Sequence, residues 1–515
     1  MKLLKAMATV AGLTGLSRIL GFARDILTAA ILGAGPIADA FFVALKLPNF
    51  FRRVTAEGAF SVSFVPLYSA HLEKDGAAQA DSFASNAFAV MLVFLVPFTI
   101  AALFAMPWII YAIAPGFESN ELRYVAAVEL SSITFPYLLL MSLAALLGGV
   151  LNARDRFAPF AAAPVFFNLC LIMALLFFAK TAQTPGHALA WGVFAAGIVQ
   201  LAWLFWCIKR AGISFKFRFP SFDADIKKLF KLMGPGVIGA GVIHINLFAD
   251  LIIASWLKEG SISYLYYADR LNQLPLGLVG IAVGTALLPM LSKAFAAKEN
   301  GAAQHLFNRA MEVCLILALP AAAALFLVPD ELIRVLFERG AFTAEDTLIA
   351  SHVLMGYALG LPAYICVKVF STAFWARQDT LTPVKVSVVC TIANICMALI
   401  LIRFIGVAGI AFATGLAGWV QFILLRLALR KVGETRFDAR FIKNLPRIIL
   451  SSCLMGAAVY YAAYGLEDLF ISESNFQRIL ALVAMVGVGL LSYALAILAS
   501  RVVSPSDFKT YLKRK

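Results

Sequence analysis

The chain contains many apolar segments of about 20 residues, and this feature limits the possible folds more than any other. A helix of that length spans the hydrocarbon core of a bilayer, and it bonds its backbone N–H and C=O groups internally, as hydrocarbon requires. The apolar content is 62% and the charged content 14%, against about 45–50% and 25% in soluble domains. The sequence therefore predicts an all-α polytopic membrane protein.

We predict fourteen transmembrane helices from these segments. The predicted spans are approximately 7–33, 37–69, 84–113, 123–151, 159–180, 187–208, 233–257, 263–290, 310–328, 347–376, 384–402, 407–429, 448–466 and 477–500. Before residue 233, Ile226, Leu229 and Phe230 share one helical face, and Lys227 and Lys228 lie off it. This spacing predicts an amphipathic helix at the membrane surface.

Lysine and arginine are concentrated in alternate connections between the predicted spans. The connections 209–231 and 430–447 are rich in them, whereas 114–123 and 180–187 are poor. Because cytoplasmic loops carry an excess of these residues, we expect both termini in the cytoplasm. This placement, rather than nucleic-acid binding, accounts for the net charge of +14. The seven cysteines fall within apolar spans without metal-ligand spacing, which favours a packing role.

Short motifs recur in the two halves of the chain at a nearly constant offset. Ala-Leu-Phe at 102–104 returns at 324–326, and Phe-Val-Pro-Leu-Tyr-Ser at 64–69 is similar to Leu-Leu-Pro-Met-Leu-Ser at 287–292. Two six-helix lobes of the same orientation, with substrate held between them, are typical of alternating-access transporters. The predicted regions are an N-lobe over 1–212, a cytoplasmic amphipathic linker helix over 213–232, a C-lobe over 233–432, and helices 13 and 14 with a cytoplasmic tail over 433–515.

Charged residues interrupt the first two apolar spans, where a charge facing lipid would cost about 2.5–3.5 kcal/mol. We therefore expect them to face an interior cavity. The candidate substrate-binding residues are Arg18, Arg24, Asp25, Asp39, Lys46, Arg52 and Arg53, with Arg270 from the second half. Guanidinium groups match phosphate oxygens in bidentate geometry, so a pyrophosphate is the favoured ligand, with Asp25 and Asp39 as counter-charges. The alternative is that these arginines lie at the membrane interface or join the lobes through ion pairs.

A second candidate site is a small-cation site in the predicted C-lobe. Asp250, Asn394 and Thr414 supply the hard oxygen ligands that such an ion prefers, although a hydrogen-bonded buried Asp250 also explains the pattern. The sequence has no phosphate-cradling glycine loop, nucleophile elbow or zinc spacing, which argues against an enzyme. We expect no cofactor and a coupling of transport to the membrane potential, H⁺ or Na⁺.

Several blocks resemble a known family: Gly21-Phe22-Ala23-Arg24-Asp25, Ala38-Asp39-Ala40-Phe41-Phe42-Val43-Ala44, Lys46-Leu47-Pro48-Asn49, Arg52-Arg53, Ala56-Glu57-Gly58-Ala59-Phe60 and Tyr266-Tyr267-Ala268-Asp269-Arg270-Leu271. They are similar to the MurJ (MviN) family of lipid II flippases, within the multidrug/oligosaccharidyl-lipid/polysaccharide exporter superfamily. Essential positions of that family map here onto Arg18, Arg24, Asp39, Arg52 and Arg270. Many relatives have an acidic residue where this chain has Gln273.

The resemblance implies fourteen helices in a bacterial inner membrane. It also implies that the undecaprenyl-pyrophosphate-linked peptidoglycan precursor moves from the cytoplasmic to the periplasmic leaflet, with helices 13 and 14 forming a groove for its lipid tail. Lipid II, membrane lipids and cell-wall synthases are the implied partners. Alternatives are a MATE-like small-molecule exporter, a flippase for another polyprenyl-pyrophosphate glycan, and a membrane scaffold. The scaffold should pair its charges one to one, whereas cations outnumber acids in the first two predicted helices.

Overall fold

The computed structural model describes residues 2–52, 60–216, 218–282, 287–297, 299–431 and 437–502. All regular elements within these ranges are helical. Among the described residues, ten segments are long and apolar enough to cross a membrane: Ala77–Phe104, Glu121–Ala153, Ala158–Phe178, Pro185–Arg210, Gly301–Leu327, Ala344–Ala376, Leu381–Ile405, Ala408–Arg430, Ala439–Gly465 and Asn475–Ala499. The predicted class, an all-α polytopic membrane protein, is confirmed, and the count of fourteen spans stays a prediction.

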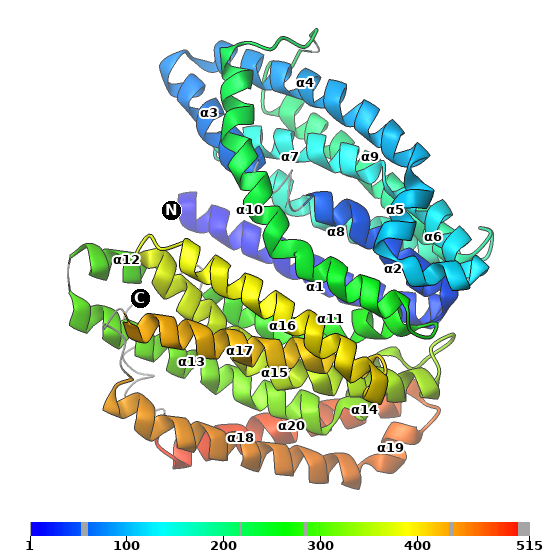
Figure 1. The fold of residues 1–515 in the computed structure, drawn as a ribbon, viewed down its shortest axis with the longest axis vertical. Coiled ribbons are helices and arrows are strands. Elements are labelled where there is room, and N and C mark those ends of the chain that lie inside the picture. The colour runs from blue at the N-terminus through cyan, green and yellow to red at the C-terminus, as the bar shows by residue number, and fades with distance from the viewer. Residues whose placement is uncertain are drawn as a thin grey trace. The chain divides into compact units, whose positions relative to one another are not determined.

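The chain divides into two compact units, which we describe separately. The first unit comprises Met1–Ser263 and Arg339–Phe342. Its elements are α1 (Lys2–Leu32), α2 (Pro36–Phe51), α3 (Ser61–Lys74), α4 (Ala77–Phe104), α5 (Met106–Ile113), the 3₁₀ helix η2 (Pro115–Ser119), α6 (Glu121–Thr134), α7 (Tyr137–Ala153), α8 (Ala158–Met173), the π-helical turn η3 (Ala174–Phe178), α9 (Pro185–Arg210) and α10 (Ala224–Ser255). Helix α1 packs against α8, α2 against α6, and both α7 and α8 against α9 (Figure 1).

Prolines divide several of the predicted spans. The predicted span 123–151 consists of α6 and α7, which are separated at Phe135 and Pro136 because proline cannot donate the helical N–H bond. The span 84–113 likewise consists of α4 and α5, with Pro107 in the first turn of α5. The span 37–69 contains α2 and α3, and residues 53–59 between them lie outside the described part of the chain.

The connection before α10 is held along α4 by side chains. Backbone amides of this connection donate to three polar residues of α4: Ser214 to Asp81 over 3.0 Å, Lys216 to Ser85 over 3.2 Å, and Ser221 to Asn86 over 2.8 Å. The Asp223 carboxylate then accepts from the Ile226 amide at the start of α10. Helix α10 continues without a break to Ser255, so part of the predicted linker helix forms its first turns.

Residues 339–342 are bound to the end of α1. The Ala341 amide donates to the Ala30 carbonyl over 2.8 Å. Gly33, which follows α1, has φ +68°, and Gly340 has φ +60°, a region that favours glycine because it carries no Cβ. A Cβ on Gly340 would also overlap the Ala30 carbonyl oxygen. Both glycines are therefore required by the backbone as it stands.

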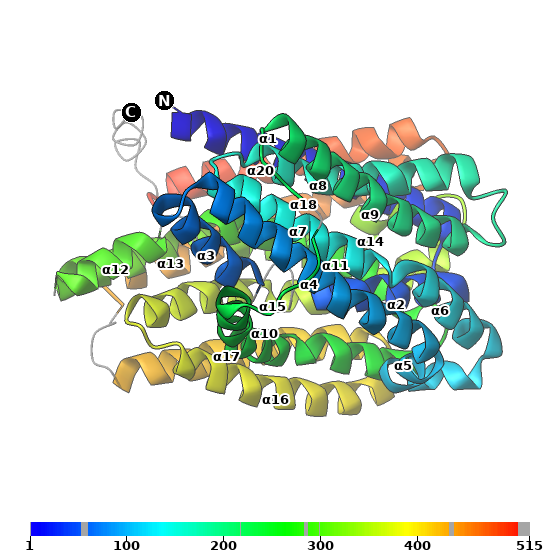
Figure 2. The same cartoon turned by 90° about the horizontal axis from the view of Figure 1, so that it is seen from above.

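The second unit comprises Tyr264–Glu338 and Thr343–Lys515. Its helices are α11 (Ser261–Ala282, which begins in the first unit), α12 (Leu288–Ala296), α13 (Asn300–Leu327), α14 (Pro329–Phe337), α15 (Ala344–Ala376), α16 (Leu381–Ile405), α17 (Ala408–Lys431), α18 (Ala439–Gly465), α19 (Glu467–Ile471) and α20 (Asn475–Ala499). Helix α17 packs against both α15 and α16, as Figure 2 also shows. Thr343 and Asp346 form a capping box at the start of α15.

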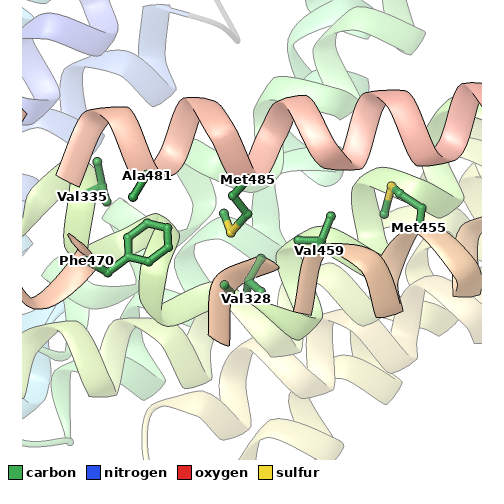
Figure 3. Close-up of a cluster of buried hydrophobic side chains, with 8 residues drawn as sticks. Val328, Val335, Met455, Val459, Phe470, Ala481 and Met485 are labelled. Carbon is green, nitrogen blue, oxygen red and sulfur yellow. The ribbon is translucent and has the colours of Figure 1, made fainter. Parts of the chain in front are cut away.

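Helices α18 and α20 pack against each other and against the α13–α14 region through a cluster of buried apolar side chains (Figure 3). The cluster consists of Val328, Val335, Met455, Val459, Ala463, Phe470, Ala481 and Met485. Two glycines allow close approach: a Cβ on Gly489 would lie 2.9 Å from Val459, and one on Gly456 would lie 2.7 Å from Leu327. The last two candidate membrane spans therefore pack as part of the second unit.

A polar cluster fixes the start of α18 on α13. The Arg309 guanidinium donates to both carboxylate oxygens of Asp438, at 2.8 and 2.7 Å, and also pairs with the buried Glu312. Asn444 donates to the other oxygen of Glu312, and the Asp438 carboxylate caps α18 through the Phe441 amide. The cluster therefore positions α18 against α13 through charge-assisted hydrogen bonds.

Candidate substrate-binding site

Arg24 and Asp25 form a buried ion pair in the last third of α1. The Nε and Nη2 atoms of Arg24 donate to Asp25 Oδ1 over 3.1 and 2.7 Å. The third guanidinium nitrogen, Nη1, donates to Asn168 Oδ1 of α8 over 3.0 Å. Arg24 is only 8% exposed and Asp25 3%. The predicted counter-charge role of Asp25 toward Arg24 thus has a direct geometric basis.

Asn168 holds this pair in place from the neighbouring helix, and the sequence analysis missed it. Its amide nitrogen donates to the Ser17 carbonyl of α1 over 2.9 Å while its oxygen accepts from Arg24. The ring of Phe167, the preceding residue on α8, lies 5.8 Å from the Arg24 guanidinium carbon. A polar residue at the centre of the apolar segment 158–173 was the available signal, because buried amides in membrane helices are usually hydrogen-bonded.

Asp39 is fully buried near the start of α2 and accepts four hydrogen bonds. Its carboxylate pairs with the buried Arg123 of α6 at 3.0 Å. It also accepts from the Gly260 amide at 2.8 Å, and from the Ser263 amide and hydroxyl at 2.9 and 2.8 Å. The partner of Asp39 among the described contacts is thus Arg123, which the sequence analysis had counted only as a loop cation. Its position at the first turn of an apolar span was the signal for burial.

The other cations predicted in the first two helices differ in burial. Arg18 is exposed on α1, whereas Lys46 and Arg52 on and after α2 are partly buried. The Arg52 Nε atom donates to Asn49 Oδ1 over 3.2 Å. Arg53 lies outside the described residues. A convergence of these side chains on one ligand stays a prediction.

In the second unit, Arg270 lies on α11 beside an aromatic cluster. Its guanidinium carbon is 4.4 Å from the centroid of the Tyr266 ring. Tyr267, the next residue, is fully buried against Phe337, with ring centroids 5.2 Å apart. Gln273 donates to Asp269 one turn along the same helix. Stacking on tyrosine orients a guanidinium group while leaving its edge able to donate to an anion.

The candidate cation ligands come from three helices. Asp250 lies on α10 in the first unit and accepts from Asn246 at 3.5 Å. Asn394 is buried on α16, and Thr414 on α17 donates its hydroxyl to the Ile410 carbonyl over 2.9 Å. Among the described residues, no group of three or more His, Cys, Asp or Glu side chains has metal-binding geometry. The cation site therefore stays a prediction.

The amino-acid sequence of this chain matches a known protein family. The model of a family described as "Lipid II flippase MurJ" matches residues 28–480. A probable lipid II flippase MurJ of Rhizobium meliloti (strain 1021) is 43% identical over 90% of this chain and 87% of its own length. The matched range includes Asp39, Arg123, Asn168 and Arg270.

Two solved structures are similar to the fold. A lipid II flippase MurJ in an inward closed conformation superposes with a TM-score of 0.78 at 29% identity, covering 95% of this chain and 97% of the other. An inward-facing multidrug-resistance MATE transporter of the MOP superfamily gives 0.68 at 14% identity over 83% and 99% of the two chains, and shows the fold alone. From the family match and the identity to its curated members, the chain belongs to the lipid II flippase MurJ family.

Proposed function

We propose that this protein is a lipid II flippase that carries the undecaprenyl-pyrophosphate-linked peptidoglycan precursor from the cytoplasmic to the periplasmic leaflet by alternating access. The observation that carries the proposal is the family match across residues 28–480. The buried Arg24–Asp25 pair of α1, which is bonded to Asn168 in the candidate span Ala158–Phe178, supports it, because ionisable side chains buried among membrane helices usually mark substrate or ion pathways.

The finer organisation is part of the same proposal. Fourteen helices form two six-helix lobes, and the last two helices, α18 and α20, provide a groove for the lipid tail. Both termini lie in the cytoplasm of a bacterium, and the protein sits in the inner membrane. The apolar surface of α20, with Leu490, Leu491 and Leu495 each more than two-thirds exposed, supports a role in contact with hydrocarbon.

Arg24 contributes by exchanging one anion for another. In the structure two of its nitrogens are bound by Asp25 and the third by Asn168. An entering diphosphate presents oxygens that match the same donors in bidentate geometry and displaces Asp25 from them. The Asn168 contact keeps the guanidinium oriented during this exchange. Arg52 and Arg270 provide further cations, so that the diphosphate crosses the membrane without exposing its charge to hydrocarbon.

The protein catalyses no covalent reaction in this proposal, and the return step is coupled to the membrane potential, H⁺ or Na⁺. One elementary charge moved across 100 mV gains about 2.3 kcal/mol, which is enough to bias an equilibrium between two states. The site formed by Asp250, Asn394 and Thr414 is the proposed location for a coupling cation. Cell-wall synthases are the proposed partners that consume the translocated substrate.

The test is to deplete the protein in its host and measure lipid II on the outer face of spheroplast membranes with an impermeant probe. Wild-type protein and Arg24→Lys are re-expressed at equal levels, since lysine keeps the charge but cannot reproduce the three-nitrogen geometry. We expect the outer-leaflet signal to disappear on depletion, to return with wild type, and to return only weakly with Arg24→Lys. An unchanged signal on depletion would exclude this function. Loss of a different polyprenyl-linked glycan with normal lipid II would identify another substrate.

A further inference from the structure

The first unit contains a cavity that none of the candidate substrate-binding residues lines. It has a volume of about 470 Å³ and lies between α1, α8 and α9. Its lining is Leu13, Arg156, Ala158, Pro159, Ala162, Val165, Phe166, Trp203, Trp206, Cys207 and Arg210. We call it the Arg156–Arg210 groove.

Aromatic rings form the apolar wall of the groove. Phe166 of α8 and Trp203 of α9 have ring centroids 5.1 Å apart, and Trp203 stacks on Trp206 with centroids 5.2 Å apart. Trp203 is fixed by a 3.0 Å hydrogen bond from its indole nitrogen to the Pro159 carbonyl at the start of α8. Trp206 is 49% exposed, so it presents an aromatic surface outward. Tryptophan in such positions favours the membrane–water interface.

Positive charge is concentrated at one end of the same groove. Arg156 precedes the first turn of α8, and Arg210 is the last residue of α9, which runs alongside α8. The Arg210 guanidinium carbon lies 5.1 Å from the Trp206 ring. Both arginines are exposed, and among the described side chains neither has an ion-pair partner. No acidic residue lines the groove.

We propose that the Arg156–Arg210 groove binds an anionic phospholipid, with the headgroup phosphate on the two arginines and an acyl chain along the Phe166–Trp203–Trp206 wall. Charge complementarity decides the occupant, because two exposed guanidinium groups with no ion pair among the described side chains, and no acidic residue in the lining beside them, match a phosphate. An aromatic wall extending about 10 Å from Arg210 to Trp203 matches the glycerol and upper acyl region of a lipid. Basic pockets between membrane helices bind lipid headgroups in this way. None of the residues that line the groove is a candidate substrate-binding residue.

The test uses the purified full-length protein in an uncharged detergent, with phosphatidylglycerol, phosphatidylcholine or inorganic phosphate added. Lipid retention by native mass spectrometry and the unfolding midpoint are both measured. The variants are Arg156→Gln/Arg210→Gln and, as a matched control, Lys209→Gln, which removes an exposed cation from the same last turn of α9 outside the groove. We expect phosphatidylglycerol to bind and stabilise wild type and Lys209→Gln, and to bind the double variant at least ten-fold more weakly.

A third variant distinguishes the loss of lipid binding from a general loss of folding. Trp206→Leu leaves both arginines and removes part of the exposed aromatic wall, and we expect it to weaken phosphatidylglycerol binding with a normal gel-filtration profile. Equal binding of phosphatidylcholine, equal protection by inorganic phosphate, or an equal loss in Lys209→Gln would each overturn the proposal. Binding of a polyprenyl diphosphate but not of phosphatidylglycerol would also overturn it, and would make the groove a substrate entrance.

Discussion

The Arg123 guanidinium lies 3.0 Å from the Asp39 carboxylate, and both side chains are almost completely buried in the first unit. The pair joins α2 to α6 across 84 residues of sequence. Arg123 also donates to the Leu257 carbonyl, and Asp39 accepts from Gly260 and Ser263. A buried pair with this many additional hydrogen bonds is strongly destabilised when only one partner is removed.

Removing Arg123 alone should therefore be more damaging than its charge suggests. We expect Arg123→Gln to lower the free energy of unfolding by about 3–5 kcal/mol, because Asp39 is left as an uncompensated buried charge. The double variant Arg123→Gln/Asp39→Asn should recover part of this loss. Denaturant unfolding in detergent measures both, with the exposed Arg403→Gln as control. Additive effects of the two substitutions would show that the pair is not coupled.

Asn168 should matter for transport through its effect on Arg24. Asn168→Leu keeps the approximate volume but removes the acceptor of Arg24 Nη1 and the donor to Ser17. We expect weaker binding of lipid II by the purified protein, with Asn168→Asp weaker still because a second carboxylate would neutralise the guanidinium. Gln200→Leu removes a buried side-chain amide that donates to the Ala163 carbonyl. It is the control for losing a buried hydrogen bond that does not involve Arg24. Equal binding by Asn168→Leu and wild type would remove Asn168 from the site.

Gly340 and Gly406 form a matched pair for testing the attachment of residues 339–342. Their φ angles are +60° and +58°, but only Gly340 has the Ala30 carbonyl where a Cβ would lie. Gly406 has a ψ of −139°, a conformation that is open almost only to glycine, so Gly406→Ala should cost about 1–3 kcal/mol for the backbone alone. Gly340→Ala should cost clearly more, because the Ala341–Ala30 hydrogen bond must also shift. The unfolding midpoints of the two variants compare them directly. Equal losses of stability would mean that the contact between residues 340–341 and the Ala30 carbonyl can shift without cost.

The cap of α18 should give stability that depends on pH. Burial raises the pKa of the Asp438 carboxyl, but the Phe441 amide and the Arg309 guanidinium outweigh burial and lower it below its ordinary value of 3.8. A lowered pKa stabilises the fold above the ordinary value and loses this contribution as the pH falls through the lowered one. Asparagine caps a helix about as well as aspartate, so Asp438→Asn removes mainly the charge that faces Arg309, and it should destabilise the protein by up to about 1 kcal/mol at neutral pH.

The difference between Asp438→Asn and wild type should shrink as the pH falls below about 4, where the carboxyl of the unfolded chain becomes protonated, and should disappear once the pH is below the lowered pKa of the folded protein. Unfolding midpoints at neutral and acidic pH measure it. Asp468→Asn, at an exposed position, should show little difference at either pH. A gap for Asp438→Asn that stays constant across this range would assign the effect to shape rather than to charge.

The sequence predicted the helical membrane class and the burial of Arg24, Asp25 and Asp39. A charged side chain inside an apolar run is costly when it faces lipid, so it is expected to face the protein interior. It could not identify Arg123 and Asn168 as partners, since they come from 84 and 144 residues away and no local spacing relates them. Such partnerships are a property of tertiary packing rather than of local pattern.

The attachment of the connection 213–223 to α4 has a practical consequence. A long connection between helices is usually the first choice for inserting an affinity tag or a fluorescent reporter. Here its amides are bound by Asp81, Ser85 and Asn86, and it ends on the residue that caps α10. An insertion would displace the start of that helix, so fusions for following the protein in living cells belong elsewhere in the chain.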